Sequence, residues 1–371
     1  MNYIRRWTPS AAIQGLVAAI LFNAAALPCA AAPTAESTYA EVTPGYSLTF
    51  PRDYGSHPQF HTEWWYVTGW LRTQSGEPLG FQVTFFRTKP TIADDNPSSF
   101  APRQLLIAHC ALSDPKRGRL WQDQRIRRAG LGLAEAETGD THVWIDDWVL
   151  RRAGSAYTTT ISAEDFGLDL KLTPSQPEML NGNAGLSRKG PAIRAASYYY
   201  SLPHMKVAGS ISRKGVAEQV TGEAWFDHEW SSEYLDDHAI GWDWIGINLN
   251  DGAALMAFRI RDAHGGARWA GGTLRGADGR MQILEPADVD FRTVRQWVSP
   301  RTGTRYPVQM QVRAGTREFD LEPLIDDQEN DTRLTTGAVY WEGAVRALEQ
   351  HRVVGRGYLE LTGYGEHLQL R

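Results

Sequence analysis

Residues 61–88 read HTEWWYVTGWLRTQSGEPLGFQVTFFRT, two apolar stretches on either side of a short polar turn. Trp64–Leu71 and Leu79–Thr88 are rich in aromatic and β-branched side chains, which pack well on a pleated sheet. Ser75-Gly76 lies between them, and a glycine in such a turn is typical of a tight hairpin. The stretch therefore predicts two antiparallel strands joined by a turn.

Short apolar stretches alternate with turns through most of the chain, and long helical periodicity is almost absent. Short strands at regular spacing are typical of β-barrels and sandwiches. We therefore expect an all-β fold, with two weak helical windows at Gln124–Leu133 and near Glu285–Asp288. The further expected strands are Leu105–Leu112, Thr141–Leu150, Tyr157–Ile161, Leu168–Leu172, Ala196–Tyr200, Met205–Ile211, Gln219–Phe226, Trp242–Leu249, Ala254–Ile260, Arg268–Leu274, Val308–Val312, Phe319–Pro323 and Gly355–Leu361.

Two segments of the chain share one pattern, which indicates an internal duplication. In each, a Trp-x-x-x-Gly sequence is followed by a turn glycine and then by a strand that ends in Phe-Arg or Phe-Phe-Arg. The first copy spans residues 65–87 and the second spans residues 242–259. A chain of 371 residues also exceeds the size at which one core usually divides. We expect two domains, residues 46–232 and 233–371.

The N-terminus has the pattern of a secretory signal. Arg5 and Arg6 precede the apolar stretch Ala11–Leu27, and small residues follow it. We expect a signal over residues 1–32 with cleavage near Ala31-Ala32, a flexible lead-in over residues 33–45, and a mature protein in the periplasm or outside the cell. An uncleaved anchor is less favoured because the apolar stretch is short for a membrane span. A lipoprotein attached at Cys29 is less favoured because proline precedes that cysteine.

Composition narrows the expected partners. The chain has 38 basic and 43 acidic residues, and removal of residues 1–32 takes away two arginines and no acid, so the net charge changes from −5 to −7. A mildly acidic protein is a poor partner for nucleic acid, so none is expected. Cys110 is the one cysteine that remains after cleavage, so we expect the fold to rest on its core without an internal disulfide.

The densest group of chemically active side chains lies at the start of the predicted hairpin. On a strand, His61, Glu63 and Trp65 face one side. Trp64 and Tyr66 face the other. A histidine and a carboxylate on one face suit acid–base catalysis or two ligands of a metal. The alternative is structural: the rings belong to the core and the polar pair is hydrogen-bonded at a barrel end.

Two further groups follow. Asp227-His228-Glu229-Trp230 comes after a predicted strand, and Gly241-Trp242-Asp243-Trp244 begins the next one. Two carboxylates beside a histidine could supply metal ligands, but no His-Glu-x-x-His or paired cysteine motif is present. We therefore expect no metal and no cofactor. Asp243 is either an inward acid with a raised pKa or a polar residue on the outer face. Alternation places it opposite to the flanking tryptophans, which favours a position that faces outward or toward the second domain.

Several aromatic-rich motifs, in this order, resemble the hydroxyneurosporene synthase family, which contains the carotenoid 1,2-hydratases and their exported AttH-like relatives. The resemblance covers nearly the whole mature chain. It implies two lipocalin-like antiparallel β-barrel domains packed together, with the motifs near their interface. The motifs are His61–Tyr66, Ser197–Ser201, Asp227–Ser231, Gly241–Trp244, Trp297–Pro300, Tyr306–Val308, Tyr340–Val345 and Gly355–Tyr364.

The resemblance also implies a reaction. Carotenoid 1,2-hydratases add water to a terminal double bond: an acid protonates the alkene, and water attacks the tertiary carbocation. In that family a histidine and a tryptophan of the Asp-His-x-Trp segment matter, here His228 and Trp230, together with an acid on the following strand. That strand, Ala254–Arg259, contains no carboxylate here, so Asp243 or Glu63 would have to replace it.

We therefore expect an exported AttH-like protein that binds an apolar ligand, a lipid or an isoprenoid, and that could assist an ABC-type membrane transporter. The alternative is a hydratase of the carotenoid 1,2-hydratase type, and a third option is a purely structural or interaction module. The candidate catalytic residues are His61, Glu63, Asp227, His228 and Asp243. The candidate ligand-binding residues are the aromatic Trp64, Trp65, Tyr66, Tyr199, Trp230, Trp242 and Trp244.

Overall fold

The predicted hairpin is present in the computed structural model as strands β1 (Thr62–Thr73) and β2 (Pro78–Thr88). Trp65 pairs with Phe85 and Val67 pairs with Val83 across the two strands. All four side chains are buried, because period-2 alternation turns one face of the hairpin toward an apolar interior. The stretch thus forms the structure that its pattern predicts.

The structure describes residues 39–91, 96–98, 100–235 and 238–365. The expected signal and its cleavage site lie outside the described residues and stay predictions. The described residues all belong to one structural unit. In the described ranges, no helix combines the length and the apolar character that a membrane span requires.

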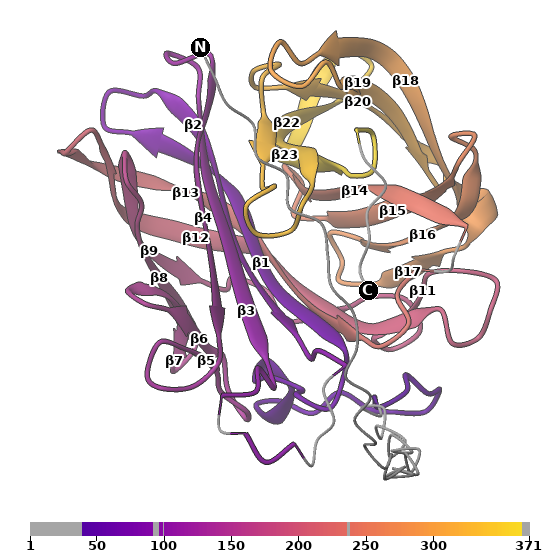
Figure 1. Cartoon of the computed structure of the whole chain (residues 1–371). Coiled ribbons are helices and arrows are strands. Elements are labelled where there is room, and N and C mark those ends of the chain that lie inside the picture. Colours follow the sequence, from indigo (N-terminus) through magenta and orange to yellow (C-terminus); the bar gives the residue numbers. More distant parts are fainter. Residues whose placement is uncertain (1–38, 92–95, 99, 236–237, 366–371) are drawn as a thin grey trace, which may run out of the picture. The chain divides into compact units, whose positions relative to one another are not determined.

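The first sheet contains strands β1 to β13 in antiparallel pairs (Figure 1). Its main path runs β4-β3-β2-β1-β13-β12-β9-β8-β7-β6-β5, and β10 and β11 pair with β12. A short 3-10 helix, η1 (Arg52–Tyr54), precedes it. The other bounds are β3 (Leu105–Asp114), β4 (Arg119–Arg128), β5 (Ala134–Ala136), β6 (His142–Ile145), β7 (Trp148–Ala153), β8 (Ala156–Ser162), β9 (Phe166–Thr173), β10 (Met179–Leu180), β11 (Leu186–Arg188), β12 (Ala196–Arg213) and β13 (Val216–Ser231).

The second sheet contains strands β14 to β23, drawn in orange to yellow in Figure 1. Its main path runs β17-β16-β15-β14-β23-β22-β20-β19-β18, and β21 pairs with β22. A second 3-10 helix, η2 (Pro286–Asp288), precedes β18. The bounds are β14 (Ala239–Leu249), β15 (Ala254–Asp262), β16 (Ala267–Arg275), β17 (Met281–Leu284), β18 (Val289–Val298), β19 (Arg305–Ala314), β20 (Arg317–Pro323), β21 (Glu329–Asp331), β22 (Val339–Glu349) and β23 (Arg352–Leu361). The expected all-β class, with two antiparallel lipocalin-like sheets, is confirmed.

The two sheets repeat one strand order. In the first, β4-β3-β2-β1 is followed by β13-β12, and in the second, β17-β16-β15-β14 is followed by β23-β22. The matching positions also carry matching side chains: Glu63 lies opposite Arg87, and Asp243 lies opposite Arg259. This is the arrangement that the duplication hypothesis predicts. The last strand of the first sheet ends at Ser231, and the first strand of the second sheet begins at Ala239. The expected domain boundary lies in this interval and stays a prediction.

Two local expectations are wrong. The strand expected at Thr141–Leu150 is divided into β6 and β7, which pair as a hairpin. Residues 124–133 do not form a helix, because β4 runs through Arg119–Arg128 and pairs with β3 along its length. β4 is an edge strand whose second half exposes polar side chains on both faces. The alternation that identifies a strand is therefore missing from this part of the sequence. The described part of the lead-in, residues 39–45, packs on the first sheet, where the Thr43 amide donates to the Tyr198 hydroxyl at 2.9 Å.

The sheets meet through a third apolar cluster that includes Trp70, Trp225 and Tyr358. Trp70 Nε1 donates to the Gly357 carbonyl oxygen at 3.0 Å. Gly80 allows a close approach at this contact, because a Cβ added there would lie 2.6 Å from the Ala344 Cβ. The cluster holds the outer face of β1 and β2 against β22 and β23.

Candidate functional site

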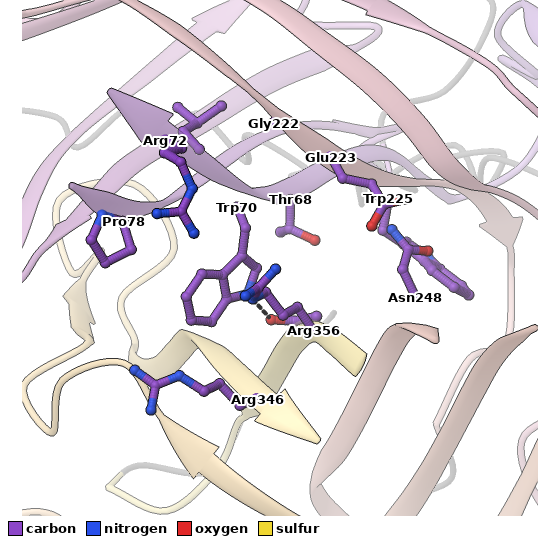
Figure 2. Close-up of a pocket in the computed structure, with 13 residues that line it drawn as sticks. Thr68, Trp70, Arg72, Pro78, Gly222, Glu223, Trp225, Asn248, Arg346 and Arg356 are labelled. Carbon is purple, nitrogen blue, oxygen red and sulfur yellow. Dashed lines mark hydrogen bonds between the residues drawn. The ribbon is translucent and has the colours of Figure 1, made fainter. Parts of the chain in front are cut away.

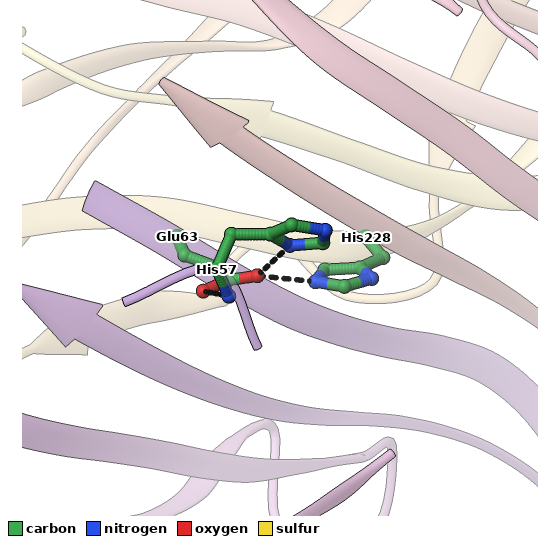
Figure 3. A group of neighbouring side chains, drawn as sticks. All are labelled: His57, Glu63 and His228. Carbon is green, nitrogen blue, oxygen red and sulfur yellow. Dashed lines mark hydrogen bonds and ion pairs between the residues drawn. The ribbon is translucent and has the colours of Figure 1, made fainter. Parts of the chain in front are cut away.

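The carboxylate of Glu63 lies inside the first sheet, at the centre of a hydrogen-bonded network (Figure 3). One oxygen lies 2.8 Å from His57 Nδ1 and 2.8 Å from His228 Nε2. The other accepts from Arg87 Nε at 2.8 Å and from the His57 amide at 2.8 Å. His57 and His228 also reach outward, to Asp53 at 3.2 Å and to the Tyr200 hydroxyl at 3.2 Å respectively. Four donors therefore surround one buried carboxylate.

Aromatic rings enclose this network. The Trp230 ring is stacked on His57 with the ring centroids 3.7 Å apart, and Trp65 is stacked on His228 at 4.8 Å. All four side chains are buried. These rings pack on the histidines, so they form part of the first core.

The pKa shifts follow from this packing. Burial on its own would raise the pKa of Glu63, but the charges of His57 and Arg87 outweigh it and hold the pKa well below its usual range. Burial lowers the pKa of His228. The pKa of His57 is raised, because Glu63 and Asp53 overcome the opposite effect of burial. The network is thus arranged around an ionised Glu63.

Three possible metal ligands lie close together in this network, because one atom each of His57, Glu63 and His228 falls within 4.8 Å of the others. The Glu63 oxygen that faces both histidines is already shared by two hydrogen bonds. The guanidinium of Arg87 lies 2.8 Å from its other oxygen and would repel a cation. The donor set is better explained as a buried ion-pair network, and the expectation of no metal stays a prediction.

Asp243 occupies the equivalent place in the second sheet. The expected outward position of Asp243 is wrong: its side chain is fully buried, and both Arg259 and Arg261 donate to it, the latter through Nε at 3.1 Å. The Tyr364 hydroxyl donates to it at 2.9 Å. Asp243 and Glu63 are therefore matching interior acids of the two repeats, each paired with an arginine on the neighbouring strand.

A cleft between the two sheets contains a different set of groups. The cavity measures about 70 Å³ and is lined by aromatic rings and by carboxyl groups from both sheets. Trp64 and Trp242 contact Tyr234 edge to face at 5.0 and 5.7 Å between ring centroids, and all three are half-buried. Its lining residues are Thr62, Trp64, Tyr66, Thr84, Phe86, Tyr199, Asp227, Glu229, Tyr234, Trp242, Trp244, Tyr340, Glu342 and Glu360.

Asp227 lies at the inner wall of this cleft. Its carboxylate accepts from Tyr199 at 2.8 Å, from Ser201 at 2.5 Å and from Trp225 Nε1 at 2.7 Å. Burial raises the pKa of Asp227 to about 7, although the three donors favour its ionised form. The Tyr199 hydroxyl in turn accepts from Trp244 Nε1 at 3.1 Å, which fixes two of the rings.

Glu229, two residues further along β13, forms an ion pair inside the cleft. Lys189 Nζ lies 2.8 Å from its carboxylate, and Ser197 also donates to it. Lys189 is itself buried and lies 4.2 Å from the Phe258 ring centroid. Burial raises the pKa of Glu229 and lowers that of Lys189, while the attraction between the two charges acts against both shifts.

Glu342 and Glu360 face the cleft from the second sheet, directly opposite each other on β22 and β23. Glu342 is 2% exposed, and its carboxyl group interacts with the hydroxyls of Tyr66 and Tyr340. Burial and the neighbouring Glu360 raise the pKa of Glu342 well above its ordinary value. Burial also raises the pKa of Glu360 to about 7. The surroundings of Glu342 therefore favour its neutral, protonated form.

Comparison with known proteins agrees with this architecture. The family model of AttH-like proteins matches residues 41–364. The chain belongs to the AttH-like family. A protein from Nitrosomonas europaea that is assigned to AttH has a crystal structure with 55% sequence identity to this AttH-like chain; the match covers 88% of this chain and 100% of that one, with a TM-score of 0.84. Among curated proteins, none matches the sequence.

Two more distant structures share the fold of the AttH-like chain. Kievitone hydratase from Nectria haematococca is 14% identical, with 88% of this chain and 96% of that chain covered and a TM-score of 0.67. CghA, crystallised with Sch210972, is 14% identical, with 89% and 98% covered and a TM-score of 0.53. At these identities the likeness concerns the fold alone.

The predicted site residues lie in three different parts of the AttH-like protein. Six of them line the cleft between the sheets: Trp64, Tyr66, Tyr199, Asp227, Trp242 and Trp244. Four lie inside the first sheet: Glu63, Trp65, His228 and Trp230. Asp243 lies inside the second sheet, bonded to Arg259 and Arg261, and is therefore separate from the Glu63–His228 pair.

The expected pairing of His61 with Glu63 is also wrong. β1 begins at Thr62, and the preceding turn brings His57 back onto Glu63 instead. The His61 ring packs against Tyr39 with the ring centroids 4.6 Å apart. Burial lowers the pKa of His61, and it contributes to neither cluster.

Sequence reasoning missed several groups that line the cleft. Glu342 and Glu360 lie within motifs that carry the family resemblance, but the sequence did not single them out as acids of a site. The sequence pattern indicated Glu229 only as a possible metal ligand beside His228. Alternation in Tyr340-Trp341-Glu342 places the first and third residues on one face. That signal, combined with an antiparallel pairing of the last two strands, could have identified Glu342.

Proposed function

We propose that this AttH-like protein is an enzyme that protonates a carbon–carbon double bond of an apolar substrate, as a hydratase or a related lyase. The observation that carries the proposal is Glu342, a buried carboxylic acid that lies directly opposite a second acid, Glu360, in an aromatic-lined cleft. A carboxyl group kept neutral by burial can donate a proton at neutral pH. The site proposed for this reaction is the cleft between the sheets.

In the proposed reaction, Glu342 transfers its proton to one alkene carbon and leaves a cation on the other. The faces of Trp64 and Trp242 stabilise that cation. Water then attacks the cationic carbon, and a carboxylate takes up the proton that the water loses. Glu360 suits this second role, because it is half-buried and its pKa of about 7 leaves part of the population ionised. Transfer of that proton back to Glu342, directly opposite Glu360, completes the cycle.

The other ionisable groups of the cleft have separate environments. Asp227 is held by three donors and Glu229 by Lys189, so both are positioned as acceptors. Pairs of acids whose environments separate their pKa values are typical of acid–base catalysis. The remaining ionisable groups that line the cleft are the hydroxyls of Tyr66, Tyr199, Tyr234 and Tyr340.

The size of the cleft limits the substrate. A cavity of about 70 Å³ holds a few water molecules or the branched end of a hydrocarbon chain. The rest of a longer substrate would leave past the half-buried rings of Trp64, Tyr234 and Trp242. We therefore propose a substrate whose reactive double bond is at the end of a chain.

The test uses citronellol, an acyclic terpene alcohol with a terminal trisubstituted double bond, incubated with the protein in deuterated water. The expected product is the tertiary alcohol with one deuterium on the adjacent carbon. Glu342→Gln should lower the rate by about a hundredfold or more, as loss of a general acid does. Glu318→Gln, an exposed carboxylate of the same sheet, is the matched control and should leave the rate unchanged. Equal rates in both variants would reject Glu342 as the acid.

A second candidate function, binding of an apolar ligand, is favoured by a surface groove of about 540 Å³. Met256, Phe258 and Trp269 line it, and its volume is within the range of small-molecule sites. Ile193 and Ile283 at its rim are 70% and 45% exposed. Large apolar side chains exposed around a concavity are typical of ligand grooves.

This second proposal is tested with N-phenylnaphthylamine, a dye whose fluorescence rises in apolar sites. The dye should bind saturably, and Ile283→Ser should weaken its binding severalfold, whereas Val216→Ser, at an exposed apolar position distant in sequence, should not. Equal binding in the two variants would reject the groove. Assistance to an ABC-type transporter belongs to the same proposal, and it requires that the ligand-loaded protein raise the ATPase rate of such a transporter in vesicles.

A further inference from the structure

A second cavity of about 280 Å³ lies between the two sheets, near the contact of Trp70 with β23 (Figure 2). Three arginines line it: Arg72 from β1, Arg346 from β22 and Arg356 from β23. Figure 2 shows the side chain of Arg346 between the strands of the second sheet and the Trp70 ring, and that of Arg356 close to the ring. No lining residue is shared with the acidic cleft, so this cavity is a separate site.

The arginines form an unusual like-charge arrangement. Arg346 and Arg356 lie directly opposite each other in the β22–β23 ladder. Like charges at directly opposite positions destabilise a sheet. In the described part of the chain none of the three arginines forms an ion pair. Arg72 donates to the Gly76 carbonyl oxygen at 2.8 Å, and Arg356 lies 5.6 Å from the Trp70 ring centroid.

Other arginines of the second sheet are paired with acids. Arg295, Arg301 and Arg317 each donate to a carboxylate. The one acidic residue that lines the cavity is Glu223, and its carboxylate is already bonded to His204 Nδ1 at 2.7 Å. One carboxylate therefore faces three guanidinium groups, and the cavity keeps an excess of positive charge.

The two ends of the interface between the sheets thus differ in charge. On β22 the acidic cleft is lined by Glu342 and the basic cavity by Arg346, four residues further along the strand. Four residues correspond to roughly 13 Å along a strand. The close packing of Gly80 on Ala344 and Tyr358 separates the two.

We propose that the basic cavity binds the phosphate or diphosphate group of a small molecule. Guanidinium groups bind phosphate oxygens through paired hydrogen bonds, and three of them suit a group with two or more negative charges. Trp70 and Trp225 supply an apolar wall for the remainder of the ligand. Trp70 Nε1 is already bonded to Gly357, so that side chain offers only its ring. Because the two sites share no residue, this proposal does not rest on the proposed reaction.

The probe is inorganic pyrophosphate, measured by calorimetric titration at low ionic strength, where surface charges are least screened. The wild-type chain should bind it saturably with one site per chain. The double variant R346Q/R356Q should bind at least tenfold more weakly. Arg352→Gln, an exposed arginine at the start of β23, is the matched control and should bind within twofold of the wild type.

Thermal unfolding supplies a second readout that does not depend on heats of binding. Without ligand, the double variant should unfold at the same temperature as the wild type or higher, because a like-charge pair has been removed. Pyrophosphate should raise the unfolding temperature of the wild type and of R352Q, but not of the double variant. The proposed site would be refuted if pyrophosphate changed the unfolding temperature of all three proteins equally, or if folded wild type did not bind it. Binding of citrate as tight as that of pyrophosphate would overturn the assignment to phosphate.

Discussion

Replacing Glu63 by glutamine tests whether the network inside the first sheet holds the fold together. The variant keeps the size of the side chain and removes its charge. Arg87, which is buried and lies 2.8 Å from the carboxylate, then loses the charge that compensates its own. The amide NH₂ also replaces an oxygen at a place where every neighbouring group is a donor.

The expected cost follows from these contacts. Breaking a buried ion pair by removing one partner costs about 3–5 kcal/mol, because an uncompensated charge stays buried. A domain is stable by about 5–15 kcal/mol in total, so the loss is a large part of the free energy of unfolding. The pKa of Glu63 in the folded protein is well below its value in the unfolded chain. The ionised carboxylate therefore stabilises the fold fully above the unfolded pKa, and this stabilisation is lost as the pH falls through the folded pKa. The gap between wild type and variant should therefore narrow in acid.

The assay is urea unfolding followed by tryptophan fluorescence at pH 7 and again at about pH 3, where ionised carboxylates are being lost. Glu135→Gln, at an exposed position of β5 in the same sheet, is the control and should change stability by less than about 0.5 kcal/mol. A loss below about 1 kcal/mol at neutral pH would refute the reasoning that Glu63 compensates Arg87. So would a gap that widens in acid.

Three further outcomes follow from the packing and the pKa shifts. Glu342→Gln should become more stable than wild type as the pH rises from about 5 to 8, by at most about 1.4 kcal/mol per pH unit. The reason is that the raised pKa of Glu342 makes the folded wild type hold a proton that the unfolded chain releases. Denaturant titrations at two pH values check this, and a difference in unfolding free energy that does not change with pH would contradict it. Gly80→Val should lose about 1–3 kcal/mol, since its Cβ would lie 2.6 Å from the Ala344 Cβ; calorimetric unfolding measures the loss, and an unchanged transition would show that the sheets can move apart freely. Cys110 is buried and burial raises the pKa of its thiol, so a disulfide reagent should label it only when the protein unfolds; labelling of the native protein within minutes would be the opposite result.

The local pattern of the sequence predicts most of the fold. Strand alternation is a property of neighbouring residues, so the hairpin of β1 and β2 and the faces of Trp64 and Glu63 follow from it. The same rule correctly places Trp242 and Trp244 on the face opposite to Asp243. What alternation could not decide is which face looks into a core and which looks at the other sheet. Both faces of β1 carry aromatic residues, so polarity does not separate them.

The candidate site was harder to predict because its parts come from distant strands. Glu342 and Glu360 reach the cleft only through the pairing of β22 with β23 and the docking of that pair near β1 and β13. Nothing in the local sequence fixes such long-range contacts. The histidine beside Glu63 was missed for another reason: the turn before β1 returns His57 to the strand, and turn geometry is weakly encoded by residue spacing.

The three half-buried rings at the acidic cleft have a kinetic consequence. Trp70 and Gly80 hold the sheets at a fixed separation, so the cleft cannot widen by hinge motion without breaking that contact. Admission of anything larger than a few waters then depends on rotation of Trp64, Tyr234 and Trp242 about their own side-chain bonds. Association should accordingly be slower than diffusion and should show saturation in rapid-mixing experiments. Replacing Tyr234 by alanine should speed entry and exit together, with much less effect on the equilibrium constant.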